Sequence, residues 1–386
     1  MNTDHPAVKY HLDSRGKIET AVKSRLETPE DLALAYTPGV AEVCRTIAAE
    51  PETADLLTNR GNTVAIVSDG TAILGLGNIG PSAGLPVMEG KAMIFKKMAG
   101  VDAVPLCIEV DSVEDIIRFC KQIEPSFGGI NLEDIAAPGC FEILERLEKE
   151  LSIPVFHDDQ DGTAIVSTAA LINAAKVRGS EIGSLRVVIN GSGAAGIAIA
   201  RLLTSYGIKD VVLVDSKGIL GVERADLNES KKEIATRTNP HNLSGDLATA
   251  LAGADVFIGV SKGNVLDRDS IRLMAERPII FAMANPDPEI LPDEALAGGA
   301  FIVGTGRSDF PNQINNALVF PGLFRGLLDA RAADPSRSMP KDMTAMKLAA
   351  AQALAGCVEP TQGQILPSVM DPSVVPAIRA AVLAQK

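Results

Sequence analysis

Residues 185–215 read LRVVINGSGAAGIAIARLLTSYGIKDVVLVD, in which two apolar runs flank a glycine-rich turn and a segment of helical pattern over 194–206. The turn has the pattern G-x-G-x-x-G. Its first glycine permits a tight turn, its second lets the backbone approach a pyrophosphate, and its third lets the helix pack closely on the sheet. The helix N-terminus adds backbone donors for phosphate groups. The stretch predicts a dinucleotide-binding unit of the Rossmann type, and a tight turn beside an empty crevice is the alternative.

The acid that closes this stretch bears on the choice of nucleotide. Asp215 lies 19 residues after Gly196, where an acid that binds the ribose hydroxyls is expected. Asp215 would repel the 2′-phosphate of NADP, whereas Lys217 would attract it, so NAD and NADP both stay open. The cofactor contacts predicted in this stretch are Gly191, Ser192, Gly193, Ala194, Ala195, Gly196, Asp215 and Lys217.

Similar apolar runs recur on both sides of this stretch and alternate with segments of helical pattern. They lie at 63–68, 101–110, 254–260, 278–284 and 300–306. Continuous apolar strands separated by helices indicate parallel sheet covered on both faces, so the predicted fold class is α/β. We expect a catalytic and metal-binding domain over 1–160, a Rossmann-like domain over 161–310, and a helical segment over 311–386 that packs back on the first domain.

The composition argues against several classes of partner. The 386 residues include 36 Lys and Arg against 49 Asp and Glu, a formal net charge of −13. This balance argues against binding to nucleic acid or to anionic membranes. Aromatic residues make up 4% and Trp is absent, so surfaces for base stacking are few. The partners that we expect are small metabolites and cations.

The cysteines and the start of the sequence indicate the compartment. The five cysteines are scattered and contain no C-x-x-C pair, which is typical of a reducing cytosol. The start, MNTDHPAVKYHLD, lacks the apolar segment of a signal peptide, and no apolar run reaches the roughly 18 residues of a membrane span. We expect a cytoplasmic protein without membrane contact.

Pairs of acids follow two of the predicted strands. Glu133 and Asp134 come at the end of one strand, and Asp158 and Asp159 follow another, with Asp161 close behind. Acids crowded at the carboxyl ends of strands repel one another unless a cation holds them. Oxygen ligands without a Cys or His cluster suit Mg²⁺ or Mn²⁺. Taken singly, each acid has the alternative of an exposed loop residue or a helix cap.

Two further side chains are candidates for proton transfer. Lys91 is expected near the start of a helix over about 87–99, where the helix dipole and burial would lower its pKa and suit it to act as a base. Tyr36 ends a short helix that begins after Thr28 and stops at Pro38 and Gly39. The alternatives are an exposed surface lysine and a rim or core tyrosine.

A second match to G-x-G-x-x-G lies at 75–80, in the segment GLGNIG. It runs directly into Pro81, so we predict no helix at its third glycine and no pyrophosphate site there. We interpret it as a rigid loop that shapes a site, with a purely structural turn as the alternative.

Several of these segments together resemble one family. The chain is similar to the malic enzymes, in their short bacterial form, from about Leu26 to Asp329. The matching segments are AYTPGV, VSDGTAILGLGNIGPSAGLPVMEGK, NLEDI, FHDDQDGTA, GSGAAG, FAMANPDPE and NQINNALVFPG. The resemblance implies oxidative decarboxylation of L-malate to pyruvate and CO₂, NAD or NADP as hydride acceptor, Mg²⁺ or Mn²⁺ as the metal, and a homodimer or higher homo-oligomer.

The resemblance also implies roles for single residues. By position, Tyr36 matches the general acid of the family and Lys91 its general base, and Asp158 matches a carboxylate beside the base and the metal. The implied metal ligands are Glu133, Asp134 and Asp159. The asparagines implied near the substrate carboxylate and the nicotinamide are Asn285, Asn315 and Asn316.

One position departs from the family, and two other functions stay open. Longer members have an arginine that binds a malate carboxylate where this chain has Ala72, so the carboxylate anchor is unassigned. One alternative is another NAD(P)-dependent dehydrogenase that shares only the Rossmann-like domain, which would not need the paired acids. The other is a catalytically silent dinucleotide-binding regulator, which would typically lack Lys91, Tyr36 or a metal ligand.

Overall fold

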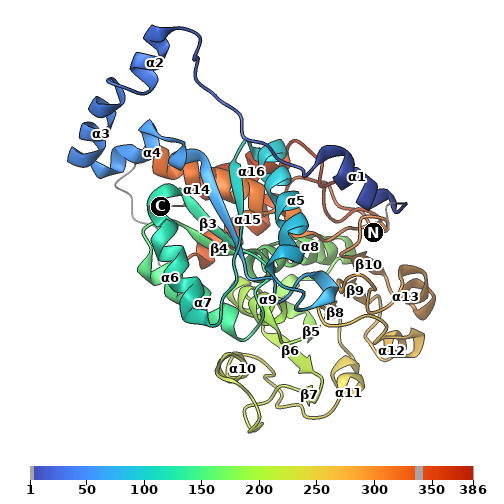
Figure 1. The fold of residues 1–386 in the computed structure, drawn as a ribbon. Helices are drawn as coiled ribbons and strands as arrows, with labels where there is room; N and C mark the ends of the chain where they lie inside the picture. Colours follow the sequence, from blue (N-terminus) through green and yellow to red (C-terminus); the bar gives the residue numbers. More distant parts are fainter. Residues whose placement is uncertain (1–3, 335–341, 386) are drawn as a thin grey trace.

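The structure, a computed structural model, describes residues 4–334 and 342–385 and contains two β-sheets (Figure 1). The first sheet has the strand order β2-β1-β3-β4, and all its strand pairs are parallel. Every residue of β1 and β3 is buried, as expected for parallel strands between layers of helices. The strands are β1 (Thr63–Ser68), β2 (Asp102–Cys107), β3 (Gly129–Leu132) and β4 (Val155–His157).

The second sheet confirms the predicted α/β class. Its order is β10-β9-β8-β5-β6-β7, and it is parallel except for β7, which pairs antiparallel with β6. The strands are β5 (Arg186–Asn190), β6 (Asp210–Asp215), β7 (Gly218–Ile219), β8 (Val256–Gly259), β9 (Ile279–Ala282) and β10 (Ile302–Thr305). The strand order reverses at β5, which lies between β6 and β8. In open α/β sheets, ligands bind at the carboxyl ends of strands at such a switch point.

The helices beside the first sheet correct one prediction. They are α5 (Pro81–Ala99), α6 (Val113–Ile123) and α7 (Gly139–Glu150). Helix α5 begins at Pro81, directly after Gly80, and not at about residue 87. The prediction that no helix opens at the third glycine of GLGNIG is therefore wrong. Proline suits the first turn of a helix, where its missing N–H needs no partner, and α5 also accommodates Pro86 in its interior.

The helices of the second sheet match the sequence pattern closely. Helix α8 (Thr163–Arg178) ends at Gly179, whose φ of 78° suits a glycine C-cap. Helix α9 (Ala194–Tyr206) has the predicted bounds. Four short helices complete this part, namely α10 (Glu229–Ala235), α11 (Leu247–Leu251), α12 (Arg268–Arg272) and α13 (Pro292–Gly298). Within residues 4–334 and 342–385, no helix combines the length and the apolar character that a membrane span requires.

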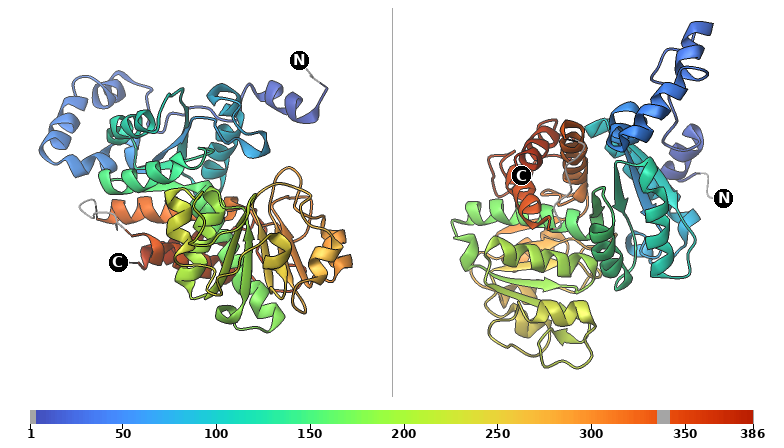
Figure 2. Two further views of the ribbon diagram at one scale, coloured as in Figure 1. Left: turned by 90° about the horizontal axis from the view of Figure 1, so that it is seen from below. Right: turned by 90° about the vertical axis from the view of Figure 1, so that its left-hand side faces the viewer.

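Three C-terminal helices connect the two sheets (Figure 2). Helix α14 contacts α5, and α15 contacts both α8 and α9. They are α14 (Phe320–Ala333), α15 (Thr344–Ala355) and α16 (Val374–Leu383). The ring of Phe324 in α14 packs against Phe95 in α5 and Phe156 in β4, with ring centroids 5.3 Å and 5.9 Å apart, and all three side chains are fully buried. This aromatic cluster holds α14 to the first sheet. The domain limits at 160 and 310 stay a prediction.

The N-terminal helices α2 (Pro29–Ala35) and α3 (Val40–Ala49) form an arm that projects away from both sheets (Figure 1). They lie between α1 (Pro6–Ser14) and α4 (Ala54–Leu57) in the chain. Helix α2 begins as predicted, because the side chains of Thr28 and Asp31 each accept a hydrogen bond from the backbone N–H of the other. The sequence did not predict α3, since Pro38 and Gly39 were interpreted only as a stop. No residue of α2 or α3 is buried.

Candidate active site

A cleft of about 650 Å³ lies between the two sheets. Its walls include the loops that follow β3, β8 and β9, the first turn of α9, part of α5 and the loop before α14. Predicted site residues in its lining are Lys91, Glu133, Asp134, Asp159, Ala194, Ala195, Asn285, Asn315 and Asn316. The fold therefore gathers into one cleft residues that are far apart in the sequence.

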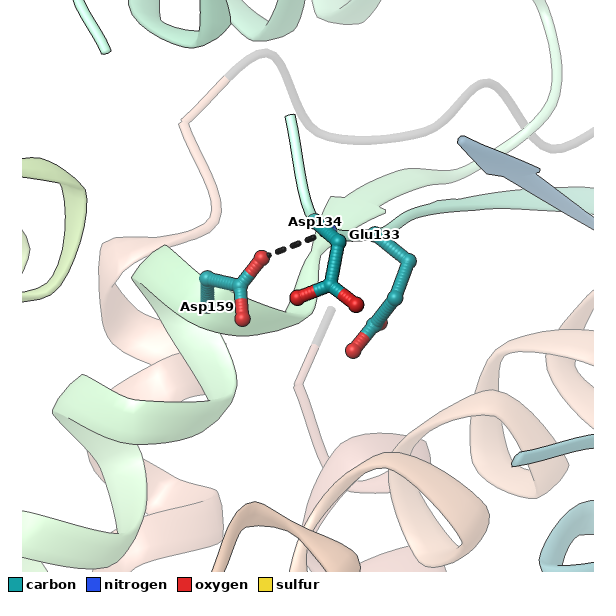
Figure 3. Close-up of side chains that lie close together, drawn as sticks. All are labelled: Glu133, Asp134 and Asp159. Carbon is teal, nitrogen blue, oxygen red and sulfur yellow. Dashed lines mark hydrogen bonds between the residues drawn. The ribbon is translucent and has the colours of Figure 1, made fainter. Parts of the chain in front are cut away.

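The three predicted metal ligands converge on one wall of the cleft (Figure 3). One side-chain oxygen from each of Glu133, Asp134 and Asp159 lies within 4.8 Å of the others. Strands β3 and β4 are neighbours, with Leu132 opposite His157, so the residues that follow the two strands meet. Asp134 has a φ of 52°, and its backbone N–H donates a hydrogen bond to Asp159 at 2.8 Å. This turn directs the carboxylates toward a common space.

The electrostatics of this cluster favour a cation. Burial raises the pKa of Glu133 to about 7, where the attraction of Lys91 opposes the rise and the charge of Asp159 adds to it. Burial also raises the pKa of Asp159. Burial and mutual repulsion disfavour the ionised form of these carboxylates, and a bound cation would stabilise that form. Oxygen donors suit Mg²⁺ or Mn²⁺. The residues present therefore fit the predicted metal.

Lys91 lies next to this cluster. Its Nζ is 2.6 Å from Oε1 of Glu133 and donates a hydrogen bond to the carboxylate of Asp158, and its side chain is 8% exposed. The same nitrogen lies 4.6 Å from the ring centroid of Phe320. Because α5 begins at Pro81, Lys91 is in the middle of the helix and not in its first turn. The contacts that hold it come from carboxylates and not from the helix dipole.

The pKa of Lys91 is therefore raised, whereas the sequence predicted that it would be lowered. Burial acts to lower it, but the carboxylates of Asp158, Glu133 and Asp159 outweigh burial and hold the pKa above its ordinary value. The expected lowering assumed a desolvated ammonium at a helix N-terminus without acidic partners. A cation bound to the carboxylate cluster would offset their negative charge and so reduce the rise.

Asp158 is fully buried beside Lys91. Burial raises its pKa to about 7, the lysine opposes this rise, and Glu133 adds to it. Among the described residues, its Oδ1 has no hydrogen-bond partner. Asp161 belongs to a different contact, since it accepts a hydrogen bond from Lys347 at 2.7 Å. Four of the five predicted acids thus belong to the site around Lys91, and the fifth pairs elsewhere.

The glycine-rich turn leads from β5 into α9, whose first residues line the same cleft. Gly191 has a φ of 121°, which permits the tight turn after β5. A Cβ on Gly196 would lie 1.8 Å from the carbonyl oxygen of Gly191, so only glycine lets α9 approach this closely. Ala194 and Ala195, the first residues of α9, line the cleft. The positive end of α9 therefore opens on the cleft at the switch point of the sheet, as a pyrophosphate site requires.

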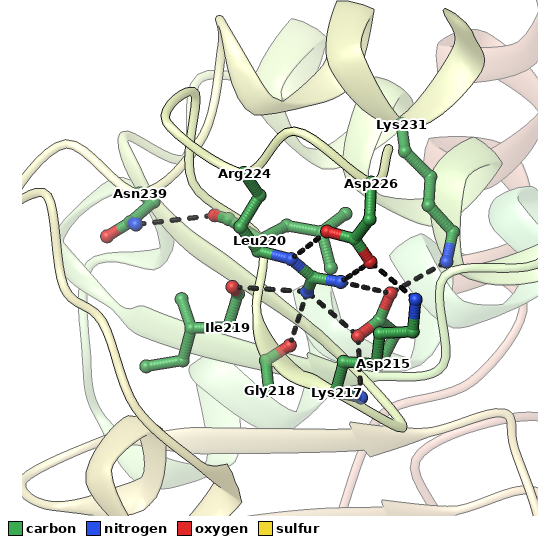
Figure 4. A network of polar contacts seen from close by, with 9 residues as sticks. All are labelled: Asp215, Lys217, Gly218, Ile219, Leu220, Arg224, Asp226, Lys231 and Asn239. Atoms are coloured by element: carbon green, nitrogen blue, oxygen red, sulfur yellow. Dashed lines mark hydrogen bonds and ion pairs between the residues drawn. The ribbon is translucent and has the colours of Figure 1, made fainter. Parts of the chain in front are cut away.

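Asp215 lies in a network of ion pairs at the end of β6 (Figure 4). Its carboxylate is 2.8 Å from Arg224 and 2.7 Å from Lys231. Partial burial acts to raise its pKa, but the hydrogen bonds from these two residues outweigh burial and hold the pKa at about 2. The ammonium of Lys217 contacts Asp226 at 2.8 Å. The spacing of the motif finds Asp215 and Lys217, but it gives no signal for Arg224 or Lys231.

The three predicted asparagines line the cleft beside Ala72. Asn285 follows β9, and Asn315 and Asn316 precede α14. A Cβ on Gly75 would lie 2.3 Å from the carbonyl oxygen of Asn285, so glycine lets the loop after β1 touch the loop after β9. Of the described residues that line the cleft, Lys91 alone has a positively charged side chain. Where longer family members have an arginine that binds a malate carboxylate, this chain therefore has neutral amides in the lining of the cleft.

Like Asp215 and Lys217, which lie at and just beyond the end of β6, Tyr36 is a predicted site residue outside the lining of the cleft. It is the C-cap of α2, on the arm, and its side chain is 67% exposed. It is not part of the cleft lining described above. A single chain therefore assembles the lysine and the carboxylates without the tyrosine.

Two site residues were missed in the sequence. Glu289 is fully buried and accepts hydrogen bonds from the backbone N–H groups of Ser261 at 3.1 Å and Ala284 at 3.0 Å. It thereby connects the loops after β8 and β9, and Ser261 and Ala284 line the cleft. Glu289 lies within the segment FAMANPDPE and could have been noticed as an acid there, whereas Ser261 carries no sequence signal.

A Rossmann-like sheet and a second parallel sheet, with a buried lysine and a carboxylate cluster in the cleft between them, define a nicotinamide-nucleotide-dependent oxidoreductase. Two family descriptions match this chain: the malic enzyme N-terminal domain over residues 15–148, and the malic enzyme NAD binding domain over residues 160–385. The chain belongs to the malic enzyme family.

Individual relatives agree over nearly the whole chain. The bifunctional malic/malolactic enzyme of Bacillus subtilis is 50% identical over 386 residues, which cover 99% of this chain and 92% of that protein. The NADP-dependent malic enzyme of Rhizobium meliloti is 46% identical and covers 98% of this chain and 51% of its own length. The crystal structure of the NAD-dependent malic enzyme of Thermotoga maritima is 51% identical, with a TM-score of 0.93 over 98% of this chain and 99% of that one. The resemblance to the short bacterial malic enzymes is confirmed.

Proposed function

We propose that this chain oxidises L-malate and decarboxylates it to pyruvate and CO₂, with reduction of NAD or NADP. The observation that carries this proposal is the position of Lys91. It is buried, 2.6 Å from Glu133, in a cleft that Ala194 and Ala195 of the glycine-rich motif also line. A proton acceptor is thereby held between a carboxylate cluster and a dinucleotide site, an arrangement suited to oxidation of a 2-hydroxy acid.

The cleft offers places for two bound groups. Glu133, Asp134 and Asp159 would hold Mg²⁺ or Mn²⁺, and residues 191–196 would hold the pyrophosphate of the nucleotide. When bound, the nucleotide would supply a hydride acceptor, and the cation would supply Lewis-acid stabilisation of negative charge on the substrate oxygens.

The side chains of the chain itself supply proton transfer and orientation. Lys91 accepts the proton of the C2 hydroxyl group, and Asp158 holds its Nζ through a hydrogen bond. The amides of Asn285, Asn315 and Asn316 offer donors to the substrate carboxylates, in the part of the cleft that includes Ala72.

We further propose a homodimer, or a higher homo-oligomer, in which Tyr36 enters the cleft of a second copy and protonates C3 of the enol product. Within one chain, the arm places Tyr36 outside the cleft. The arm also exposes apolar side chains: Leu32 is 49% and Leu34 77% exposed. A second copy would cover these side chains and complete the site in the same contact.

The compartment and the domain limits complete the proposal. We place the enzyme in the cytoplasm, in agreement with its five cysteines, all of which are free thiols.

We divide the chain into residues 1–160, 161–310 and 311–386. The first limit falls between β4, which ends at His157, and α8, which begins at Thr163, and the second falls between β10 and α14.

The stoichiometry of the products tests the proposed reaction. The purified protein is incubated with L-malate, Mn²⁺ and each nucleotide, and pyruvate, CO₂ and reduced nucleotide are measured together. We expect the three in equal amounts. Oxaloacetate without CO₂ would indicate a dehydrogenase that shares only the Rossmann-like domain, and nucleotide binding without any turnover would indicate a silent regulator.

A further inference from the structure

A cluster of charged side chains surrounds the end of β6, beside the glycine-rich turn. The backbone N–H of Gly191 donates a hydrogen bond to the carbonyl oxygen of Val214 at 2.9 Å, so the residue that follows Val214 lies next to the turn. We call this group the Asp215 cluster (Figure 4). It consists of Asp215, Lys217, Arg224, Asp226 and Lys231.

The carboxylate of Asp215 is fully used as an acceptor. Its Oδ1 accepts hydrogen bonds from the backbone N–H of Lys217 at 2.9 Å and from Nη1 of Arg224 at 2.8 Å. Its Oδ2 accepts from Nη2 of Arg224 at 3.2 Å and from Nζ of Lys231 at 2.7 Å. A carboxylate offers about four acceptor positions. A ribose hydroxyl could therefore donate to Asp215 only by displacing one of these bonds.

Arg224 is fixed in this position by the fold. Besides Asp215, it donates to both oxygens of Asp226, at 3.0 Å and 2.8 Å, and to the carbonyl oxygens of Gly218 at 3.2 Å and Ile219 at 3.4 Å. These two carbonyl groups belong to β7, and the Arg224 side chain is 15% exposed. The guanidinium is therefore held against the hairpin of β6 and β7. To leave Asp215, it would have to break its hydrogen bonds to the carbonyl oxygens of Gly218 and Ile219.

The cluster as a whole is positively charged. Its three cations outnumber its two carboxylates, which leaves one net positive charge. The side chain of Lys217 is 66% exposed and its Nζ contacts only the partly exposed carboxylate of Asp226, while the side chain of Lys231 is 23% exposed. The ammonium of Lys217 can turn toward an anion at small cost, because a solvent-exposed ion pair is weak. The ammonium of Lys231 stays bonded to Asp215 and has two further N–H groups that can donate to an anion.

We propose that the Asp215 cluster receives the 2′-phosphate of NADP and that this chain binds NADP in preference to NAD. The proposal rests on the dinucleotide site of the proposed function. A 2′-hydroxyl needs a free acceptor, which Asp215 does not offer, whereas a 2′-phosphate needs donors, which Lys217 and Lys231 supply. The repulsion expected between Asp215 and the phosphate is offset by the cations around Asp215. The acid is therefore part of the scaffold that holds the cations.

Two fragments that differ only in this phosphate test the proposal directly. Calorimetry on the purified full chain measures binding of 2′,5′-ADP and of 5′-AMP. We expect 2′,5′-ADP to bind more tightly by about tenfold or more, since a charge-assisted hydrogen bond contributes at least that factor. In the double variant Lys217→Gln and Lys231→Gln, this preference is lost, while the affinity for 5′-AMP does not fall, because the variant removes donors to the phosphate and no acceptor for the ribose hydroxyl.

The matched control is Lys232→Gln, on the same helix α10, whose ammonium pairs with Glu229 at 2.8 Å outside the cluster. It should retain the preference for 2′,5′-ADP. Equal or tighter binding of 5′-AMP to the unmodified protein would overturn the proposal and leave the dinucleotide site intact. Binding of neither fragment would refute the dinucleotide site itself, and with it the proposed function.

Discussion

Lys91 shows how burial and charge compete at one side chain. Water is excluded from its Nζ, which favours the neutral amine, while Asp158 and Glu133 favour the ammonium. The carboxylates prevail in the structure without a cation. Since Glu133 is shared with the carboxylate cluster, a bound cation and the proton on Lys91 compete for the same negative charge. The base and the metal site therefore depend on each other.

Substitution of the lysine tests its role as the base. In Lys91→Met, which keeps an apolar stem of similar length, we expect malate oxidation to fall by about 10²- to 10⁴-fold, the usual contribution of a general base. Binding of reduced nucleotide, followed by its fluorescence, should be unchanged, because residues 191–196 are untouched. Full activity of the variant would remove Lys91 from the mechanism.

Substitution of Asp159 tests the metal site. In Asp159→Asn we expect the affinity for Mn²⁺, measured from the free-ion signal in electron paramagnetic resonance, to fall by more than about tenfold. Asp293→Asn, an exposed acid in α13, is the matched control and should bind Mn²⁺ as the unmodified protein does. Unchanged affinity in Asp159→Asn would exclude this residue from the ligands.

At the scale of elements, a group of charged side chains connects α15 to α7 in a half-buried position. Lys347 of α15 lies 2.7 Å from Asp161 and 3.9 Å from Glu148 of α7. Burial raises the pKa of Glu148 to about 7, and the charge of Asp161 adds to this effect while Lys347 opposes it. The folded protein therefore binds a proton at Glu148 more tightly than the unfolded chain does.

This shift makes stability depend on pH in a defined direction. Because the folded pKa lies above the unfolded one, the contribution of Glu148 is complete below pH about 4.5 and is lost as the pH rises to about 7. Glu148→Gln should match the unmodified protein in urea unfolding near pH 4.5 and exceed it by about 3 kcal/mol at pH 8, since each unit of pKa difference corresponds to about 1.4 kcal/mol. Glu142→Gln, an exposed acid on the same helix, should show no such difference. A constant gap at both pH values would contradict this account of Glu148.

The elements that the sequence predicts well are those with a local signal. The strands of the second sheet are continuous apolar runs, and α9 begins at Ala194, directly after the second glycine of the G-x-G-x-x-G motif. The start of α5 was missed because Pro81 was interpreted as a break, although proline fits a first helical turn. The partners of Asp215 and Asp161 could not be predicted. Arg224 contacts Asp215 because of the path of the loop after β7, and Lys347 contacts Asp161 because of the position of α15. Neither position can be deduced from residue spacing in the sequence.

At the scale of the whole molecule, the arm separates Tyr36 from the cleft that was predicted to need it. The resemblance implies a role for Tyr36 as the general acid, which stays a prediction, and it gives no information on which copy of the chain Tyr36 serves. Helices α2 and α3 bury no residue of their own, so the arm has no core that fixes it against its own chain. An oligomer would give the arm both a packing partner and a function.

Mixed oligomers distinguish the two possibilities. The variants Lys91→Met and Tyr36→Phe are each inactive alone under the proposal. If Tyr36 acts in the cleft of a second copy, co-refolding the two variants restores activity, because the intact lysine of one copy meets the intact tyrosine of the other. If the tyrosine acts within its own chain, every cleft in the mixture lacks one group and no activity returns. Measurement of malate oxidation before and after co-refolding gives the answer.

The most direct test of the central claim is the absorbance of reduced nicotinamide nucleotide during incubation of the purified chain with L-malate. With Mn²⁺ and NADP, we predict a steady rise that stops on addition of a chelator and resumes on restoration of excess Mn²⁺. A rise that ignores the chelator would contradict the metal-dependent site at Glu133, Asp134 and Asp159. No rise with either nucleotide, in a protein that still binds one of them, would contradict the proposed oxidation of malate.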